Sequence, residues 1–192
     1  MHHKNNKEGI MKTKPLCTVG SLILMLLLAG CAGLDAKADV PLKSSVHGKR
    51  VVVFPFQDPY CKGRQIQGIG EPFASVFVHK LLTSGVSAEL SKNREFSSLT
   101  SIDIDKACKY AAGNGYDMLM VGVVTEWIDG ATQWSGKVDV AALFVKVYNS
   151  KTCTLSGAAS GRKSGRLITF VNAPTTRFFE PLSEKVIEAL LE

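Results

Sequence analysis

Lys49-Arg50-Val51-Val52-Val53-Phe54-Pro55-Phe56 is the stretch that decides the expected fold of this chain. Three β-branched residues and an aromatic one follow each other without a polar interruption, which is typical of a strand buried on both faces. Pro55 has no N–H group to donate to a neighbouring strand, so strand pairing should stop there. We therefore predict a central strand of a sheet at this position.

Helical and strand patterns alternate downstream of this strand. Apolar residues recur at helical spacing between Gly70 and Ser84, and Asp103 or Asp105 can cap a second helix over residues 106–112. A last helix is predicted from the apolar positions between Phe179 and Leu190. Further strands are expected over residues 86–90, 118–124, 138–148 and 153–161, with a hairpin turn at residues 149–152.

The resulting order is strand-helix-strand-helix-strand-strand-strand-helix. Helices between the early strands favour a mixed sheet covered by helices, and the late hairpin adds antiparallel strands. We predict the α/β class, as a three-layer-like sandwich formed by residues 49–192 in a single domain. Residues 126–137 and the basic piece at 162–166 are expected to be connecting segments, the latter leading to the apolar stretch at 167–170.

The N-terminal part of the chain has the pattern of a secretory signal peptide. Basic residues precede an apolar run that begins at Ser21 and ends in Leu28-Ala29-Gly30-Cys31. The run is shorter than the roughly 20 residues that a membrane-spanning helix needs. Residues 1–30 are therefore expected to be removed, and Met11 is a better start of translation than Met1.

The residues Leu28, Ala29, Gly30 and Cys31 resemble the lipobox of bacterial lipoproteins. The resemblance implies that Cys31 carries a diacylglyceryl group and an N-acyl chain, and we expect no other cofactor. Ala32, in place of an aspartate, is compatible with sorting to the outer membrane, where the protein would face the periplasm. Residues 31–48 show no periodicity and are predicted to be a tether between lipid and domain.

Charge and cysteine content narrow the classes of function. The chain has 23 Lys and Arg against 17 Asp and Glu, but four Lys and one Glu lie in the leader, which leaves the mature part at +3. Such a weak charge does not argue for nucleic acid as a partner. Cys61, Cys108 and Cys153 remain in the mature part, so at most one disulfide can form, and small buried thiols are the alternative. Their spacing does not indicate a zinc site.

Several motifs together resemble the curli-secretion lipoprotein family and its relatives. They are the strand at residues 51–56, Gly68-Ile69-Gly70 before a helix, the strand Tyr116–Trp127 and the hairpin Val145–Thr152. The relatives are lipoproteins that activate penicillin-binding proteins, the outer-membrane lipoprotein of Pel polysaccharide export and, more distantly, the N-terminal domain of TolB. The segment that begins at Ser164 also resembles a group of uncharacterised bacterial lipoproteins. The resemblance implies a TolB-like α/β domain over residues 49–192.

Few residues suggest a chemical role. Trp127 and Trp134 flank one connecting segment and are candidates for an interface or a glycan platform, although core packing of such aromatics is the more common outcome. Arg162, Lys163 and Arg166 form one dense basic cluster, which suggests either a solvated hairpin end or contact with headgroups or an acidic polymer. Gly68-Ile69-Gly70 before a helix could cradle an anion, but a tight turn is the simpler interpretation.

The roles that catalysis or metal binding would require are not filled by any motif in the sequence, so we predict a protein that is not an enzyme. The expected function is that of an anchored accessory in envelope assembly or export, which forms a homo-oligomer or joins an envelope complex. A polysaccharide is one candidate partner. One alternative is a regulator of a cell-wall synthase, and another is a glycan-binding module that rests on Trp127 and Trp134.

Overall fold

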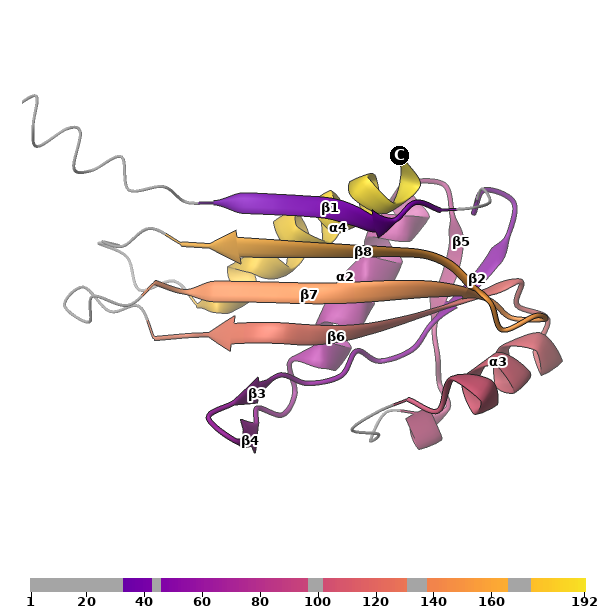
Figure 1. Cartoon of the computed structure of the whole chain (residues 1–192), viewed down its shortest axis with the longest axis horizontal. Helices are drawn as coiled ribbons and strands as arrows, with labels where there is room; N and C mark the ends of the chain where they lie inside the picture. Colours follow the sequence, from indigo (N-terminus) through magenta and orange to yellow (C-terminus); the bar gives the residue numbers. More distant parts are fainter. Residues whose placement is uncertain (1–32, 43–45, 97–101, 131–137, 166–173) are drawn as a thin grey trace, which may run out of the picture. The chain divides into compact units, whose positions relative to one another are not determined.

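A six-stranded sheet runs through the described part of the chain, in the strand order β1-β8-β7-β6-β2-β5 (Figure 1). The computed structural model describes residues 33–42, 46–96, 102–130, 138–165 and 174–192. Its strands are β1 (Leu34–Val40), β2 (Arg50–Val53), β5 (Ser87–Leu90), β6 (Met118–Ile128), β7 (Val140–Asn149) and β8 (Leu155–Ser164). Strand β2 pairs in parallel with β5 and β6, whereas the pairs β6–β7, β7–β8 and β8–β1 are antiparallel. The predicted α/β class with a mixed sheet is confirmed.

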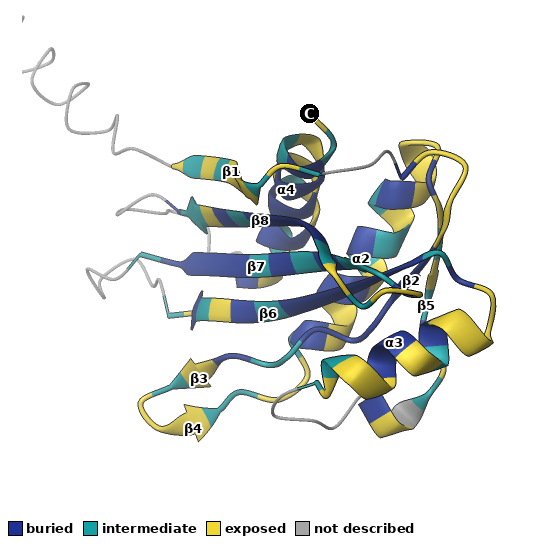
Figure 2. Ribbon diagram, turned by 45° about the vertical axis from the view of Figure 1, so that its right-hand side comes forward, coloured by how far each residue is buried: buried dark blue, intermediate teal, exposed yellow. Residues whose placement is uncertain are grey.

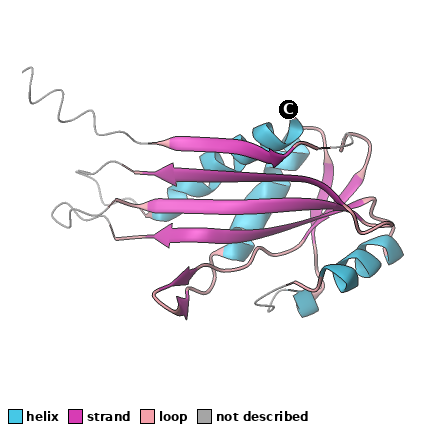
Figure 3. Ribbon diagram, in the orientation of Figure 1, coloured by secondary structure: helices cyan, strands magenta, loops and turns pink. Residues whose placement is uncertain are grey.

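The helices lie on both faces of this sheet (Figure 3). They are α2 (Gly70–Thr83), α3 (Ile104–Gly113) and α4 (Phe179–Leu191), with short 3₁₀ turns η1 (Arg94–Phe96) and η2 (Thr175–Phe178). A small separate hairpin consists of β3 (Tyr60–Cys61) and β4 (Arg64–Gln65). All three helices were predicted, and Asp103 rather than Asp105 caps α3, by accepting a hydrogen bond from the backbone N–H of Lys106 at 3.2 Å.

Strand β2 is buried on both faces, as the run of β-branched residues predicts. Val51 and Val53 belong to the larger hydrophobic cluster, together with residues of α2 and α4, whereas Val52 and Phe54 belong to a smaller cluster under α3. Phe54 still donates its N–H to the carbonyl of Met120 at 2.9 Å. Pro55 follows directly and has no N–H to donate, which ends the pairing.

The larger cluster fills the space between the sheet and the helix pair α2–α4 (Figure 2). Its aromatic centre is Phe73 of α2, whose ring centroid lies 4.2 Å from that of Phe179 and 6.2 Å from that of Trp127. The cluster under α3 is smaller and buries mainly small helix residues, namely Ala107, Cys108 and Ala111. The layer formed by α2 and α4 therefore buries more apolar surface than the layer formed by α3.

The prediction that residues 31–48 form a tether is wrong for most of the described part of that segment. Residues 34–40 form β1, which pairs with β8 from Leu34–Lys163 to Val40–Ala158. Leu34 and Ala36 pack against the larger cluster, while Asp35 and Lys37 are exposed. The alternation was present in the sequence, but alanine is too weakly apolar for the pattern to stand out.

Two connecting segments were also predicted too long, and in both cases a strand continues through them. Strand β6 extends to Ile128, past a bulge between Val124 and Glu126, and so includes part of the segment expected to be a loop. Strand β8 extends to Ser164 and includes Arg162 and Lys163. The apolar stretch at 167–170 lies outside the described residues.

A disulfide joins Cys108 of α3 to Cys153, just before β8, with a Cα–Cα distance of 5.7 Å. The sequence had left a single disulfide and buried thiols as alternatives, and the structure selects the disulfide. Cys61 is a free, partly buried cysteine in the hairpin β3–β4. The bridge ties the smaller helix layer to the turn between β7 and β8.

Candidate functional site

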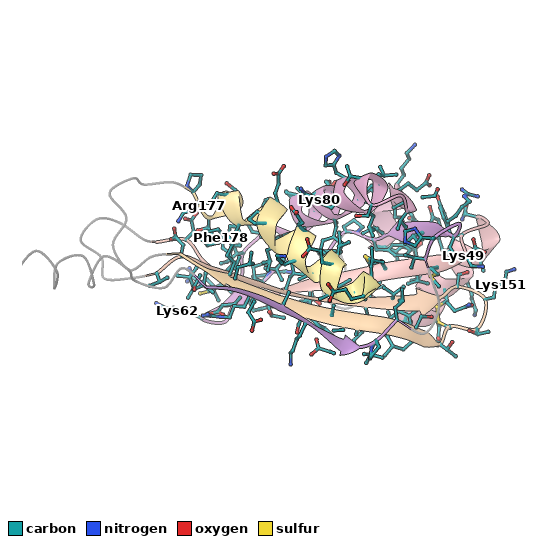
Figure 4. The ribbon with its side chains drawn as sticks, turned by 90° about the horizontal axis from the view of Figure 1, so that it is seen from above. Lys49, Lys62, Lys80, Lys151, Arg177 and Phe178 are labelled. Atoms are coloured by element: carbon teal, nitrogen blue, oxygen red, sulfur yellow. A yellow bond between two sulfur atoms is a disulfide. The ribbon has the colours of Figure 1, made fainter. Side chains whose placement is uncertain are left out.

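Part of one sheet face is not covered by any described helix. Helices α2 and α4 cover the opposite face (Figure 4), and α3 packs over β2 and β6. The outward-pointing residues that remain come from three neighbouring strands. We call them the uncovered sheet face: Ala142, Phe144 and Lys146 of β7, Ser160 and Arg162 of β8, and Asp35, Lys37 and Asp39 of β1.

Strand alternation explains why these residues share a face. Leu143, Val145 and Val147 of β7 point to the helix pair and belong to the larger cluster, so their neighbours Phe144 and Lys146 point the other way. Phe144 is only partly buried, and the ammonium of Lys146 lies 5.5 Å from its ring centroid. The residue pairs Phe144–Ser160 and Asp35–Arg162 are adjacent across the strands. The face therefore combines one large aromatic with charges of both signs.

Phe144 separates two shallow hollows on this side of the sheet. One hollow, of about 230 Å³, is mostly apolar and is lined by Val123, Ile102 and Ile104 among others. The second hollow, of about 280 Å³, is lined by Asp35, Lys37, Thr125 and Arg162. Both are open to solvent, which suits contact with another surface better than enclosure of a small ligand.

Three charged side chains of this face form ion pairs, one of them with Glu126 of β6. The Nε of Arg162 lies 2.9 Å from Oε2 of Glu126, and this hydrogen bond raises the pKa of the arginine. Lys37 lies 3.1 Å from Asp39, whose pKa is lowered chiefly by a hydrogen bond from Ser160. Exposed pairs of this kind add little to stability, but they provide polar contacts at the rim of an interface.

Among the described residues, those predicted as functional are not brought together. Trp127 is 6% exposed, and its ring centroid lies 5.5 Å from that of Phe179, so it packs in the core and the predicted interface role is wrong. Its burial confirms the interpretation as core packing. Cys31, the lipobox residues Leu28, Ala29 and Gly30, and also Trp134 and Arg166, lie outside the described residues.

Arg162 and Lys163 do not form one cluster, because neighbouring side chains of a strand point to opposite faces. Arg162 reaches Glu126 on the uncovered sheet face, while the ammonium of Lys163 lies 5.6 Å above the ring of Phe178 on the helix side. The prediction of a basic hairpin end treated residues 162–166 as a loop. The extension of β8 to Ser164 overturns that prediction for these two residues.

The glycine motif before α2 is already filled by a carboxylate of the chain itself. Both oxygens of Asp58 accept backbone N–H groups, from Gly68 at 3.0 Å, Ile69 at 2.8 Å and Gly70 at 2.7 Å. These are the donors that an external anion would need at a helix N-terminus. The motif is therefore an internal cap, and the interpretation as a tight turn is the better one.

We also searched the described residues for a metal site and for a membrane-spanning helix. There, no group of three or more His, Cys, Asp or Glu side chains could hold a metal ion. Within the same residues, no helix is long and apolar enough to cross a bilayer. The uncovered sheet face could not be predicted from the sequence. The alternation of residues in β7 shows that the strand has two faces, but it does not show how much of the second face α3 covers.

The fold is that of a small mixed α/β domain, and it is similar to the folds of solved bacterial proteins. The PelC dodecamer from Paraburkholderia phytofirmans matches with a TM-score of 0.62 and 14% identity, over 82% of this chain and 97% of that one. The lipoprotein GNA1162 from Neisseria meningitidis matches with a TM-score of 0.50 and 11% identity, over 73% and 96%. No family model and no curated protein matches the sequence.

These similarities agree with the predicted resemblance to bacterial lipoproteins and to the lipoprotein of Pel export, since the similar structures include a lipoprotein and a PelC protein. At such identities they show the fold alone. A relationship to the curli-secretion family is not shown.

Proposed function

We propose that this chain is a lipid-anchored lipoprotein of the outer membrane, facing the periplasm, that serves envelope biogenesis or export without catalysis. It would act by binding further copies of itself through the uncovered sheet face. The observation that carries the proposal is the combination of this face with the open outer edge of β1, which pairs only with β8 among the described strands. An open sheet edge offers unpaired backbone groups to a partner strand.

Two considerations favour a second copy as the partner. The crystallised fold neighbour PelC is a dodecamer, so a domain of this shape can form a closed assembly. The face also carries Asp35, Lys37 and Asp39 in alternating sign, which suits contact with a surface of similar composition. The resemblance to the lipoprotein of Pel export makes a polysaccharide the cargo that we favour.

The alternatives lose support from the same structure. A regulator that reaches a distant cell-wall synthase needs a long tether, but β1 takes up residues 34–40. A glycan module was based on Trp127 and Trp134, and the first of these is 6% exposed and packs in the core. Capture of a synthase by the wild-type protein would restore the first alternative.

The test is the native mass of the mature lipoprotein extracted in mild detergent. We expect an oligomer for the wild type and a monomer for Phe144→Glu, because the new charge would be desolvated at the contact. Leu82→Glu is the matched control, since Leu82 is 51% exposed on α2, on the other side of the sheet. A monomeric wild type, or equal dissociation of both variants, would contradict the proposal.

A further inference from the structure

Gly33, the first described residue, is hydrogen-bonded to the last residue of β8 at one end of the sheet. The N–H of Gly33 donates to Oγ of Ser164 at 3.2 Å, and its carbonyl accepts from the N–H of Ser164 at 2.8 Å. Only Ala32 separates Gly33 from Cys31 in the sequence. Two residue steps span at most about 7 Å when fully extended. If Cys31 carries the lipid, as the proposed function requires, this end of the sheet cannot lie far from the bilayer.

Several strands share that end of the molecule. Ser164, the last residue of β8, pairs with Val140, the first residue of β7, and Val140 pairs with Ile128, the last residue of β6. Lys163 lies opposite Leu34. Figure 4 shows Arg177 and Phe178 at this end, whereas Lys49 and Lys151 lie at the other end of the sheet.

The hairpin β3–β4 points toward the same end. Gln57 bridges to Val123 in parallel and accepts the N–H of Val124 at 2.9 Å, so the chain runs beside β6 toward Ile128. Tyr60 follows three residues later, and Figure 4 shows Lys62 at this end as well. The hairpin is held at its base, since the N–H of Ile66 donates to the carbonyl of Pro59 at 2.8 Å and Asp58 is bound to the start of α2.

The exposed side chains at this end fit a membrane surface. The described residues have three exposed large hydrophobic side chains, and two of them, Tyr60 at 55% and Ile128 at 37%, lie here. Tyrosine is favoured where hydrocarbon meets headgroups. Lys62, Arg64 and Lys163 add positive charge and form no ion pair with any described residue. Cations beside a bilayer are attracted by anionic headgroups.

We propose that this end of the domain, formed by Tyr60, Lys62, Arg64, Ile128 and Lys163, lies directly against the anionic headgroups of the bilayer. Because the link from Cys31 is so short, the domain is held in one orientation instead of moving freely on a tether. The long axis of the sheet then points away from the membrane, with the turn that follows β7 at its far end.

The test uses the mature lipoprotein in vesicles of phosphatidylethanolamine, with and without phosphatidylglycerol, and a spin label on some lipid headgroups. The native thiol of Cys61, beside Tyr60, carries a fluorophore. The matched control carries the fluorophore at the far end, on Lys151→Cys in a Cys61→Ser background. We expect strong quenching at Cys61 and little at position 151, with a clear increase in the first signal when phosphatidylglycerol is present.

Charge reversal provides a second measurement, in which the label stays at Cys61 and only the charges change. Lys62→Glu combined with Arg64→Glu should reduce quenching at Cys61 by severalfold in phosphatidylglycerol vesicles. Lys49→Glu combined with Lys151→Glu, which carries the same change of charge at the other end, should leave it unchanged. Equal quenching at both labels, or equal effects of both double variants, would overturn the proposal.

Two further readouts separate this proposal from the proposed function. Mass spectrometry shows whether Cys31 carries lipid, and flotation shows whether the protein binds vesicles. A protein without lipid on Cys31 would contradict the proposed function itself. A lipidated protein that floats but shows no quenching at Cys61 would overturn only the orientation inferred here.

Discussion

Asp58 shows how one side chain can decide the chemistry of a whole segment. Its carboxylate accepts three consecutive backbone N–H groups at the start of α2, with donor–acceptor distances of 3.0, 2.8 and 2.7 Å. No side chain of the helix itself makes this cap. The contact also fixes the base of the hairpin that follows Asp58, so this residue joins the helix to the end of the molecule that we place on the membrane.

Replacement of Asp58 by alanine should therefore destabilise the domain. Loss of a helix cap costs about 1–2 kcal/mol, which corresponds to a fall of a few degrees in the melting temperature of a domain of this size. Asp58→Asn, which keeps one carbonyl oxygen, should cost less. Glu71→Ala is the control, because it removes a carboxylate from the same helix end. Similar melting temperatures for the alanine variants at Asp58 and Glu71 would show that the three hydrogen bonds are not important.

Trp127, Arg162 and Lys163 illustrate a second point about single residues. Residue type alone suggested a surface position for Arg162 and Lys163 and left core packing or an interface role open for Trp127. The side to which each points follows from the strand that carries it. Trp127 comes after the bulge between Val124 and Glu126 and points into the core. A bulge shifts the alternation by one residue, so the orientation of the tryptophan could not be predicted from its place in the sequence.

At the scale of single elements, β1 is the largest difference between the predicted and the observed structure of the N-terminal region. A tether would leave the domain free to move, whereas a strand that pairs with β8 at six of its seven residues is part of the sheet. Leu34 and Ala36 contribute to the larger cluster, and Leu42 lies close to Gly157, where a Cβ atom would meet its side chain at 2.7 Å.

A chain that begins at Pro41 should consequently be less stable than one that begins at Gly33. We expect a loss on the order of 2–3 kcal/mol in the free energy of unfolding, from apolar side chains such as Leu34 that lose their packing. Denaturant unfolding followed by the fluorescence of the buried Trp127 would measure it. Equal unfolding free energies for the two chains would restore the interpretation of this segment as a tether.

At the scale of the whole molecule, the two layers on the sheet are unequal. The helix pair α2–α4 contributes large buried side chains such as Phe73, Phe77 and Leu182, whereas α3 buries two alanines and a cysteine. Elements with few buried apolar contacts open at lower free energy than the rest of a fold. The disulfide from Cys108 to Cys153 compensates for this weakness, because it joins α3 covalently to the sheet.

The double variant Cys108→Ala/Cys153→Ala should accordingly open locally. We expect faster hydrogen exchange of the amides of α3, with little change in β6 and β7, and a loss of global stability of about 2–4 kcal/mol. Exchange followed by mass spectrometry distinguishes the two regions. Cys61→Ser, which removes the free thiol, serves as the control and should exchange like the wild type. A uniform increase across the sheet would contradict the difference between the layers.

The sequence by itself determined the class of fold, the central strand and the three helices. These depend on local patterns: the run Val51–Phe54, the helical spacing after Gly70, and caps such as Asp103. Such patterns act between residues that are close in the chain. They can therefore be recognised without knowledge of which distant segments meet. The lipobox-like pattern that ends at Cys31 is also a local pattern, and it stays a prediction.

Only the tertiary structure decided the rest, because it depends on pairing between distant residues. Strand β1 exists because β8, more than a hundred residues later, offers it a partner. The disulfide, the carboxylate of Asp58 at α2, and the uncovered sheet face likewise result from which segments become neighbours. The alternating pattern of a strand indicates that one face is buried, but the three-dimensional packing alone decides which helix covers that face and where the cover ends.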